Sequence, residues 1–268
     1  MAFKATTAAL KRIASNVEVE RKFNRGPKFT SLFTHNIGQL QKAPFVVRDH
    51  PGQLIRDTYY DTEDGHLDKM GVYVRQRSVR PLSSLNPTQH NNGAGDRADS
   101  EWNAKVRIGG HYSNSQFIEY DGRANVTREV QRIKGEKAKL EDLKVVSDLN
   151  TRRSEWEITH LADGKAPKSK MTVVIDDVVE AQGGTGEDGT DRAGFSHIVG
   201  EVEFFQELVT EDKNEEEHAA LRKEVGGKLM KELEEFMLAH PDLFSTDPKP
   251  IGKLSAYETW KAERKSRN

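Results

Sequence analysis

The stretch that decides the fold of this chain is residues 17–23, which read VEVERKF. Apolar and charged residues alternate along it, which predicts a β-strand with one apolar face and one charged face. The charged face carries Glu18, Glu20 and Lys22. Its two carboxylates stand about 6.6 Å apart along the strand, because each residue of a strand rises by about 3.3 Å. Such oxygen ligands suit a hard cation such as Mg²⁺ or Mn²⁺, so the stretch predicts a strand that presents a metal site.

Further segments with the same alternation, or with β-branched and aromatic content, are predicted as strands: 57–61, 71–78, 101–108, 117–121, 152–159, 171–178 and 198–206. Apolar residues at helical spacing predict helices over 29–40, 136–149 and 214–239, and Pro241 ends the last one. Strands that follow one another in sequence and outnumber the helices predict an antiparallel α+β fold. A closed barrel is one arrangement of such strands.

The composition excludes several classes of protein. The chain has 268 residues, with 41 Lys+Arg against 43 Asp+Glu, and this near-neutral total argues against a generic binder of nucleic acid or membrane surfaces. The absence of cysteine excludes disulfide scaffolds, thiolate zinc sites and cysteine nucleophiles. No apolar run approaches the roughly 18 residues of a membrane span, which predicts a soluble, cytoplasmic protein. Residues 1–17 lack acidic side chains and carry Lys4, Lys11 and Arg12, so mitochondrial targeting is the alternative.

The chain is interpreted as one interrupted domain over residues 17–260. Residues 1–16 are predicted to be a flexible N-terminus, and the basic tail 261–268 is predicted to be disordered. Two polar stretches, 83–99 and 182–194, are predicted to be loop insertions, because each is longer than an ordinary connection and apolar patterning resumes after it.

Two glycine-rich stretches are not interpreted as nucleotide-binding loops. Residues 184–189 match GxGxxG but have no surrounding strand–turn–helix pattern. Gly226 and Gly227 lie inside a predicted helix without a Walker pattern, so they are interpreted as a point of close packing.

The charged faces of the predicted strands differ in sign from strand to strand. The groups that share a face are Tyr73, Arg75 and Arg77; Lys105 and Arg107; Arg153, Glu155 and Glu157; and Glu201 and Glu203. On any one strand, a charged face is ordinarily the wet side of an antiparallel sheet. In a closed barrel, however, these faces would converge on a lumen, where Arg and Lys can clamp phosphate oxygens and carboxylates can hold a bridging metal. That arrangement suits phosphoanhydride hydrolysis without a serine or cysteine nucleophile.

Residues 17–23 also carry the ExExK signature of the CYTH, or triphosphate tunnel metalloenzyme, superfamily. Within that superfamily the chain looks most like the thiamine triphosphatases. The other supporting segments, in family order, are 56–62 (RDTYYDT), 73–77 (YVRQR), 152–156 (RRSEW) and 200–203 (GEVE). The resemblance implies an eight-stranded antiparallel barrel that forms a tunnel, with helices packed outside. It also implies Mg²⁺-dependent hydrolysis of thiamine triphosphate, with Mn²⁺ as a possible substitute.

The resemblance further implies a role for individual residues. Tyr59 and Lys105 stand where a tyrosine and a lysine are proposed to help activate the attacking water. Tyr73 stands where mammalian thiamine triphosphatases carry a tryptophan that stacks on the thiazolium. The residues implied to bind the triphosphate are Lys22, Arg75, Arg77, Lys105, Arg153 and Lys253. The residues implied to hold the metal are Glu18, Glu20, Asp176, Glu201 and Glu203, with Glu119 as a further candidate.

Two departures from the family pattern leave alternatives open. Val174 stands where the family often has an aspartate, and Tyr73 makes a weaker cation–π contact than tryptophan. The alternatives on the same fold are a tripolyphosphatase, a nucleoside triphosphatase or adenylate cyclase-type enzyme, and a non-catalytic polyphosphate-binding module. The expected partner is a small-molecule triphosphate, bound by a monomer that contacts neither nucleic acid nor membrane.

Overall fold

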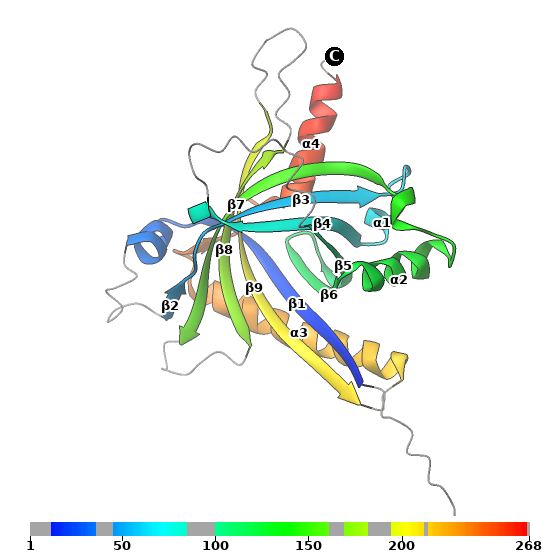
Figure 1. Cartoon of the computed structure of the whole chain (residues 1–268). Helices are drawn as coiled ribbons and strands as arrows, with labels where there is room; N and C mark the ends of the chain where they lie inside the picture. The colour runs from blue at the N-terminus through cyan, green and yellow to red at the C-terminus, as the bar shows by residue number, and fades with distance from the viewer. Residues whose placement is uncertain are drawn as a thin grey trace, which may run out of the picture.

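Eight antiparallel strands close into a barrel in the computed structural model of the chain, as Figure 1 shows. Around the barrel the order is β1-β6-β5-β4-β3-β7-β8-β9, and β9 pairs with β1 to complete it. Helices lie outside, so the expected α+β fold with an eight-stranded barrel is confirmed. The structure describes residues 12–35, 45–84, 100–160, 169–181, 194–211 and 214–266. The barrel strands are β1 (Arg12–Arg25), β3 (Gln53–Asp61), β4 (Val72–Pro81), β5 (Glu101–His111), β6 (Asn114–Asp121), β7 (Lys144–His160), β8 (Lys170–Glu180) and β9 (Ser196–Glu211).

The remaining elements surround this barrel. Two short strands extend the sheet, since β2 (Val46–Asp49) pairs with β7 and β10 (Phe244–Ser245) pairs with β1. The helices are α1 (His66–Lys69), α2 (Arg123–Lys134), α3 (Glu215–Ala239) and α4 (Lys253–Ser266).

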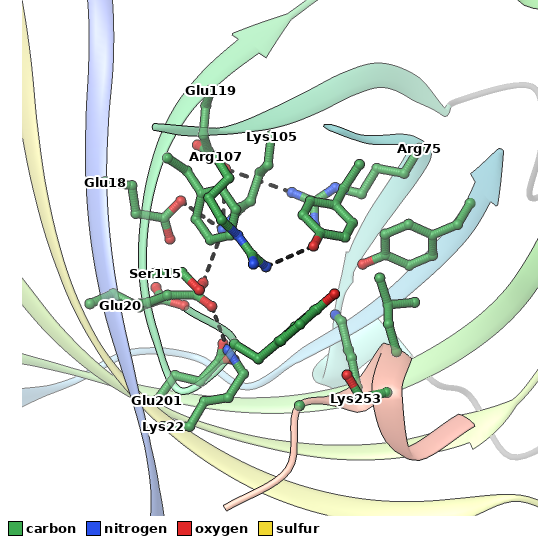
Figure 2. Close-up of a pocket in the computed structure, with 18 of the residues that line it drawn as sticks. Glu18, Glu20, Lys22, Arg75, Lys105, Arg107, Ser115, Glu119, Glu201 and Lys253 are labelled. Atoms are coloured by element: carbon green, nitrogen blue, oxygen red, sulfur yellow. Dashed lines mark hydrogen bonds and ion pairs between the residues drawn. The ribbon is translucent and has the colours of Figure 1, made fainter. Parts of the chain in front are cut away.

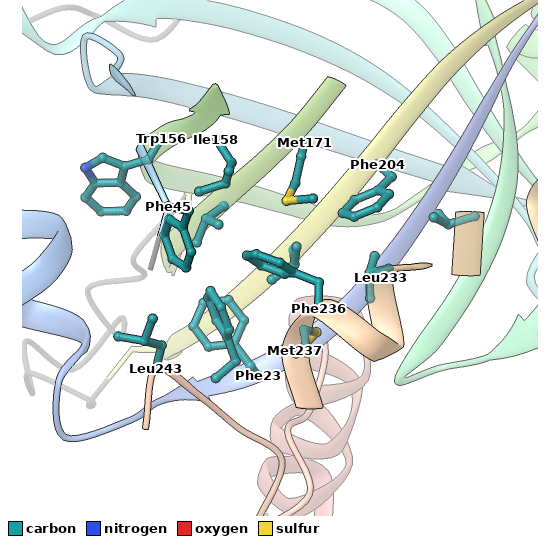
Figure 3. Packing of buried hydrophobic residues seen from close by; sticks show 14 of the residues in the cluster. Phe23, Phe45, Trp156, Ile158, Met171, Phe204, Leu233, Phe236, Met237 and Leu243 are labelled. Carbon is teal, nitrogen blue, oxygen red and sulfur yellow. The ribbon is translucent and has the colours of Figure 1, made fainter. Parts of the chain in front are cut away.

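The main hydrophobic core lies outside the barrel wall, between the strands and the helices. Val17, Val19 and Phe23 are fully buried there with Phe204 of β9 and Leu233 of α3 (Figure 3). Fully burying such a side chain stabilises the fold by about 1.5–3 kcal/mol. Because successive side chains of a strand point to opposite faces, Glu18, Glu20 and Lys22 must then point into the barrel. The lumen is therefore lined by polar groups.

Helix α3 confirms the helix predicted over 214–239. Its start is set by a capping box, in which Asn214 Oδ1 accepts from the Glu217 backbone N–H at 2.9 Å. Glu217 Oε2 in turn accepts from the Asn214 backbone N–H at 3.0 Å. These bonds satisfy donors that the first turn of a helix leaves free. The helix packs along β1 and β9 and covers the closure of the barrel.

The helix predicted over 136–149 is wrong. Only Leu140–Asp142 forms a short 3₁₀ turn, and from Lys144 onward the chain belongs to strand β7. The apolar spacing that suggested a helix comes from Leu140 and Leu143, which are buried one turn apart in a cluster of their own. Apolar residues three positions apart therefore occur here in a compact turn that precedes a strand.

The helix of this region lies earlier, at α2, where the sequence analysis placed none. Val126 and Val130 form its buried face, and the β-branched residues of this segment lower helix propensity. The helix predicted over 29–40 is present at 29–35, where Ser31–His35 is a π-helical turn. Residues 36–40 lie outside the described part of the chain.

The ends of the described chain are more ordered than predicted. Strand β1 begins at Arg12, inside the stretch 1–16 that was expected to be flexible. Helix α4 continues to Ser266, so the expectation of a disordered tail is wrong for residues 261–266. Aromatic contacts anchor this helix, because Phe195 packs edge-on against Tyr257 with 5.1 Å between ring centroids.

The predicted insertions 83–99 and 182–194 lie outside the described residues, apart from their ends at residues 83, 84 and 194. Among the helices that the structure describes, none is both long and apolar enough to cross a membrane.

Two glycines allow a paired test of the packing around the barrel closure. A Cβ at Gly200 of β9 would lie 2.5–2.8 Å from ring atoms of Phe23, which is fully buried on β1 opposite. We expect Gly200→Ala to lower the free energy of unfolding by about 1–3 kcal/mol, because the ring must move within a packed core. Chemical denaturation of both forms measures the difference.

The matched control is Gly227→Ala, on the exposed face of α3, where an added Cβ meets nothing within 4 Å. This change should raise the free energy of unfolding by up to about 1 kcal/mol, because alanine favours the helix more than glycine does. Equal effects of the two substitutions would contradict the close packing of Gly200 on Phe23.

Candidate functional site

All eight barrel strands contribute side chains to one cavity of about 420 Å³ (Figure 2). Alternation places them there, since residues two apart on a strand, such as Glu18 and Glu20, point to the same side. The start of α4 forms part of the same wall through residues 252–255. The cavity therefore collects residues from β1 to the C-terminal helix, which are far apart in the sequence.

Three carboxylates on this wall are close enough to share a metal ion. Glu18, Glu20 and Glu203 each offer an oxygen atom, and these oxygens lie within 4.8 Å of one another. Glu20 and Glu203 are direct cross-strand partners on β1 and β9, which explains their proximity. Carboxylate oxygens are the ligands that Mg²⁺ and Mn²⁺ prefer, so this group fits a hard divalent cation.

The protonation of this group depends on burial and on its cationic neighbours. Burial raises the pKa of Glu18 well above its ordinary value and raises that of Glu203 to about 7. Burial acts in the same direction on Glu20, but Lys22 and Lys105 outweigh it and lower the pKa of Glu20 to about 2. A divalent cation would favour the ionised form of all three, because it adds a nearby opposite charge to each carboxylate.

The structure does not bring the other predicted metal ligands into this group. Glu201 Oε1 lies 3.0 Å from Lys22 Nζ, which also pairs with Glu20. Asp176 accepts from Arg153 through Nε at 2.7 Å and Nη2 at 2.8 Å. Glu119 lies 3.6 Å from Lys105 Nζ, on the side of the cavity toward Arg75.

The six cations predicted to bind a triphosphate all line the cavity, and each faces a carboxylate within 4.0 Å. Lys105 Nζ lies 2.6 Å from Glu18 Oε2, and Lys22 Nζ lies 2.5 Å from Glu20 Oε1. These pairs hold the long side chains in place inside the cavity. The full set is Lys22, Arg75, Arg77, Lys105, Arg153 and Lys253.

Asp57 is a central residue of the site that sequence reasoning missed. Its carboxylate is fully buried and accepts from Arg77 through Nε at 2.7 Å and Nη2 at 2.8 Å. It also accepts from Lys253 Nζ at 3.1 Å, and so ties α4 to the barrel wall. The sequence did indicate that Asp57 could face the lumen, because it lies two residues before Tyr59 on the same face of a predicted strand.

Tyr59 lines the cavity, but its neighbours there differ from those expected. Its hydroxyl lies 3.5 Å from Asp57 Oδ2, whereas Lys105 is held by glutamates. Lys253 is the lysine that interacts with Tyr59. Burial lowers the pKa of Lys253, but Tyr59 and the nearby carboxylates outweigh burial and hold this pKa above its ordinary value.

Arg107 is the second residue of the cavity that was given no role. Its Nη2 donates to the Tyr73 hydroxyl at 2.7 Å. Its guanidinium carbon lies 5.6 Å from the ring centroid of Tyr73, 4.5 Å from that of Tyr112 and 5.7 Å from that of Phe117. The signal in the sequence was its shared strand face with Lys105.

No family model matches the chain, and no curated protein matches its sequence. Among solved structures, a Hippeastrum protein described as an adenylyl cyclase candidate with a dominant triphosphatase activity is similar over 91% of this chain and 95% of its own, at 13% identity and a TM-score of 0.45. A Bacillus halodurans adenylate cyclase candidate is similar over 81% of this chain and 91% of its own, at 16% identity and a TM-score of 0.35. A Pyrococcus horikoshii protein matches 81% of this chain and 89% of its own, at 17% identity and a TM-score of 0.34. Likenesses at these values assign no activity to the chain.

Replacing Asp57 tests the charge balance of the cavity. We expect Asp57→Asn to lower the free energy of unfolding by about 3–5 kcal/mol at pH 7, because Arg77 loses its bidentate carboxylate and Lys253 loses the nearer of its two carboxylates. The control is Asp242→Asn, which breaks an exposed pair with Lys28 and should change stability by less than about 1 kcal/mol. Chemical denaturation measures both effects.

The same comparison has a defined pH dependence. Burial raises the pKa of Asp57, but Arg77, Lys253 and Arg75 outweigh it and hold this pKa well below its ordinary value. The stabilisation is therefore complete above the unfolded-state pKa of about 3.9 and is lost as the pH falls through the folded-state value. The gap between wild type and Asp57→Asn should stay constant from pH 8 to 5 and narrow below about pH 4. A gap that narrows at alkaline pH would contradict this assignment.

Proposed function

We propose that this chain is a metal-dependent triphosphatase of the CYTH, or triphosphate tunnel, type. The observation that carries the proposal is that one cavity contains two kinds of charged group. Six cations line it together with three carboxylates, Glu18, Glu20 and Glu203, whose oxygens are spaced for one metal ion. A triphosphate is a linear polyanion that carries several negative charges and binds divalent cations. Its site therefore needs cationic side chains for the phosphates and carboxylates for the metal ion.

The finer form of the proposal is hydrolysis of thiamine triphosphate to thiamine diphosphate and phosphate, as the family resemblance implies. Unsubstituted tripolyphosphate is the second candidate substrate, and the cation already seated against Tyr73 favours it. The reaction is the same for both. A water oxygen bonds to the terminal phosphorus, and the bond from that phosphorus to the bridging oxygen breaks.

The cations of the cavity bind the phosphate chain and stabilise the charge that moves onto the leaving oxygen. Arg75 and Arg153 reach the cavity from β4 and β7, the two strands that flank β3, so both guanidinium groups can bind the same part of the phosphate chain. Lys253 approaches from α4 and completes the wall. Fixed donors of this kind need no reorganisation during the reaction, which is why they favour the transition state.

Glu18, Glu20 and Glu203 are the residues that would hold the metal ion. When bound, a divalent cation polarises the phosphoryl group and positions water for in-line attack. The carboxylates themselves hold no phosphate, because like charges repel. All of these residues come from one chain, which supports a monomer as the active form.

Removing the carboxylate group tests the metal site. We expect the triple substitution of Glu18, Glu20 and Glu203 by alanine to abolish Mg²⁺-dependent phosphate release and to weaken Mn²⁺ binding at least tenfold in calorimetry. The control Glu235→Gln removes a carboxylate from the exposed side of α3 and should change neither. Full activity of the triple variant in magnesium would show that the proposed metal site is wrong.

A substrate panel tests the activity itself. We expect phosphate release from a triphosphate in Mg²⁺ or Mn²⁺ and none in EDTA. We also expect a rise of at least tenfold in KM for Arg75→Ala or Arg153→Ala, because each removes a proposed phosphate ligand from the cavity. The panel contains thiamine triphosphate, tripolyphosphate and ATP. Strong preference for tripolyphosphate would replace the thiamine assignment, cyclic AMP from ATP would indicate a cyclase, and binding without release would indicate a binding module.

A further inference from the structure

Arg107 lines the cavity inside a cage of aromatic rings. Tyr73, Tyr112 and Phe117 all have their ring centroids within 6 Å of its guanidinium carbon, which is the range of a cation–π contact. The Tyr73 hydroxyl fixes its orientation through the hydrogen bond from Nη2 at 2.7 Å. Tyr112, at 56% exposure, is the outermost wall of this cage. The aromatic faces that could receive an organic cation are thus already shared with a cation of the chain.

The charge of Arg107 also differs from the other cationic charges of the cavity. Lys22, Arg75, Arg77, Lys105, Arg153 and Lys253 each have a carboxylate within 4.0 Å. Arg107 has no carboxylate within 4.0 Å among the residues that the structure describes. Asp68 on α1 lies farther away, where the charge of Arg107 lowers the pKa of its carboxyl against the larger, raising effect of burial. Its Nε is buried and has no acceptor in the same part of the chain. Rings and a hydroxyl hold this guanidinium without neutralising it.

The aromatic contacts of Arg107 and its charge, which lacks a carboxylate partner in the described chain, both affect which substrates can bind beside Tyr73. A cationic group placed on Tyr73 would meet the like charge of Arg107 and compete with it for the ring faces. An additional phosphate at the same place would bring the opposite charge and an acceptor for Nε. An anionic chain therefore gains from Arg107 where an organic cation loses.

We propose that Arg107 is the specificity-determining residue of this cavity, and that it selects triphosphates without a cationic organic group over those that carry one. The inference rests on the proposed triphosphate binding and narrows its substrate class to triphosphates without a cationic organic group, such as tripolyphosphate. In this proposal Arg107 determines specificity by its charge, and Tyr73 orients the guanidinium through the hydrogen bond to its hydroxyl.

The test compares Arg107→Met, which removes the charge and keeps the length of the side chain, with wild type. Calorimetry in EDTA measures the binding of tripolyphosphate and of thiamine triphosphate without turnover. We expect tripolyphosphate to bind at least tenfold more weakly to the variant. Thiamine triphosphate should bind equally well or better, so the ratio of the two dissociation constants should shift at least tenfold.

Two control variants distinguish the effect of a positive charge at residue 107 from the effect of removing any cation of the cavity. Arg107→Lys keeps the charge, and its ratio should stay within about threefold of wild type. Lys170→Met removes another cation of the cavity, on β8, and should weaken both ligands alike. A ratio in Arg107→Met equal to that of wild type, or of Lys170→Met, would overturn the proposal. Thermal unfolding of each variant identifies any that fails to fold, and Arg107→Gln then replaces Arg107→Met.

The test of Arg107 can fail independently of the test of the proposed hydrolysis. If the ratio shifts but no triphosphate releases phosphate in Mg²⁺, Arg107 selects the ligand of a binding module and the proposed hydrolysis is wrong. If phosphate is released but the ratio does not shift, the activity stands and the role of Arg107 is wrong.

Discussion

The pairing of β1 with β9 is the interaction on which the rest of the structure depends, because it closes the barrel and sets the register of the charged faces. In this register Glu20 lies opposite Glu203, and Lys22 lies opposite Glu201. Two carboxylates of the metal group and one ion pair thus meet across a single strand boundary. A slip of one residue would turn these side chains to the outer face. That face packs against α3, so the apolar core outside the barrel enforces the arrangement of charges inside it.

A barrel filled with charged groups is stable only if those groups are paired. A single charge in a dry interior is strongly unfavourable, whereas Asp57 with Arg77, and Asp176 with Arg153, form bidentate pairs. The same pairing prepares the proposed reaction. An incoming polyanion and a metal ion can exchange partners with the existing cations and carboxylates, so no charge has to be left unpaired while the substrate binds.

Strand alternation made much of the site predictable, because in a barrel the faces of all strands converge. Glu18, Glu20 and Glu203 were proposed from alternation and resemblance, but within a set of five carboxylates that also held Asp176 and Glu201. The pairing of Asp176 with Arg153 could not be predicted, because residues 23 positions apart become neighbours only through the register of β7 and β8. The wrong helix at 136–149 has a related cause. A buried turn and a helix can share the same apolar spacing, and only packing against α2 distinguishes them.

The sequence by itself determined which side chains can face the lumen, since the period of a strand is a local property of the backbone. It also determined the exposed and buried faces of α3 and the cap that starts it. The tertiary structure alone decided which lumen charges touch one another, because barrel closure and register bring together residues that no local pattern connects. It gathered three glutamates for a metal and placed Arg107 among aromatic rings without a carboxylate partner in the described chain. Electrostatic and cation–π contacts depend on distances of a few ångströms, and folding sets those distances.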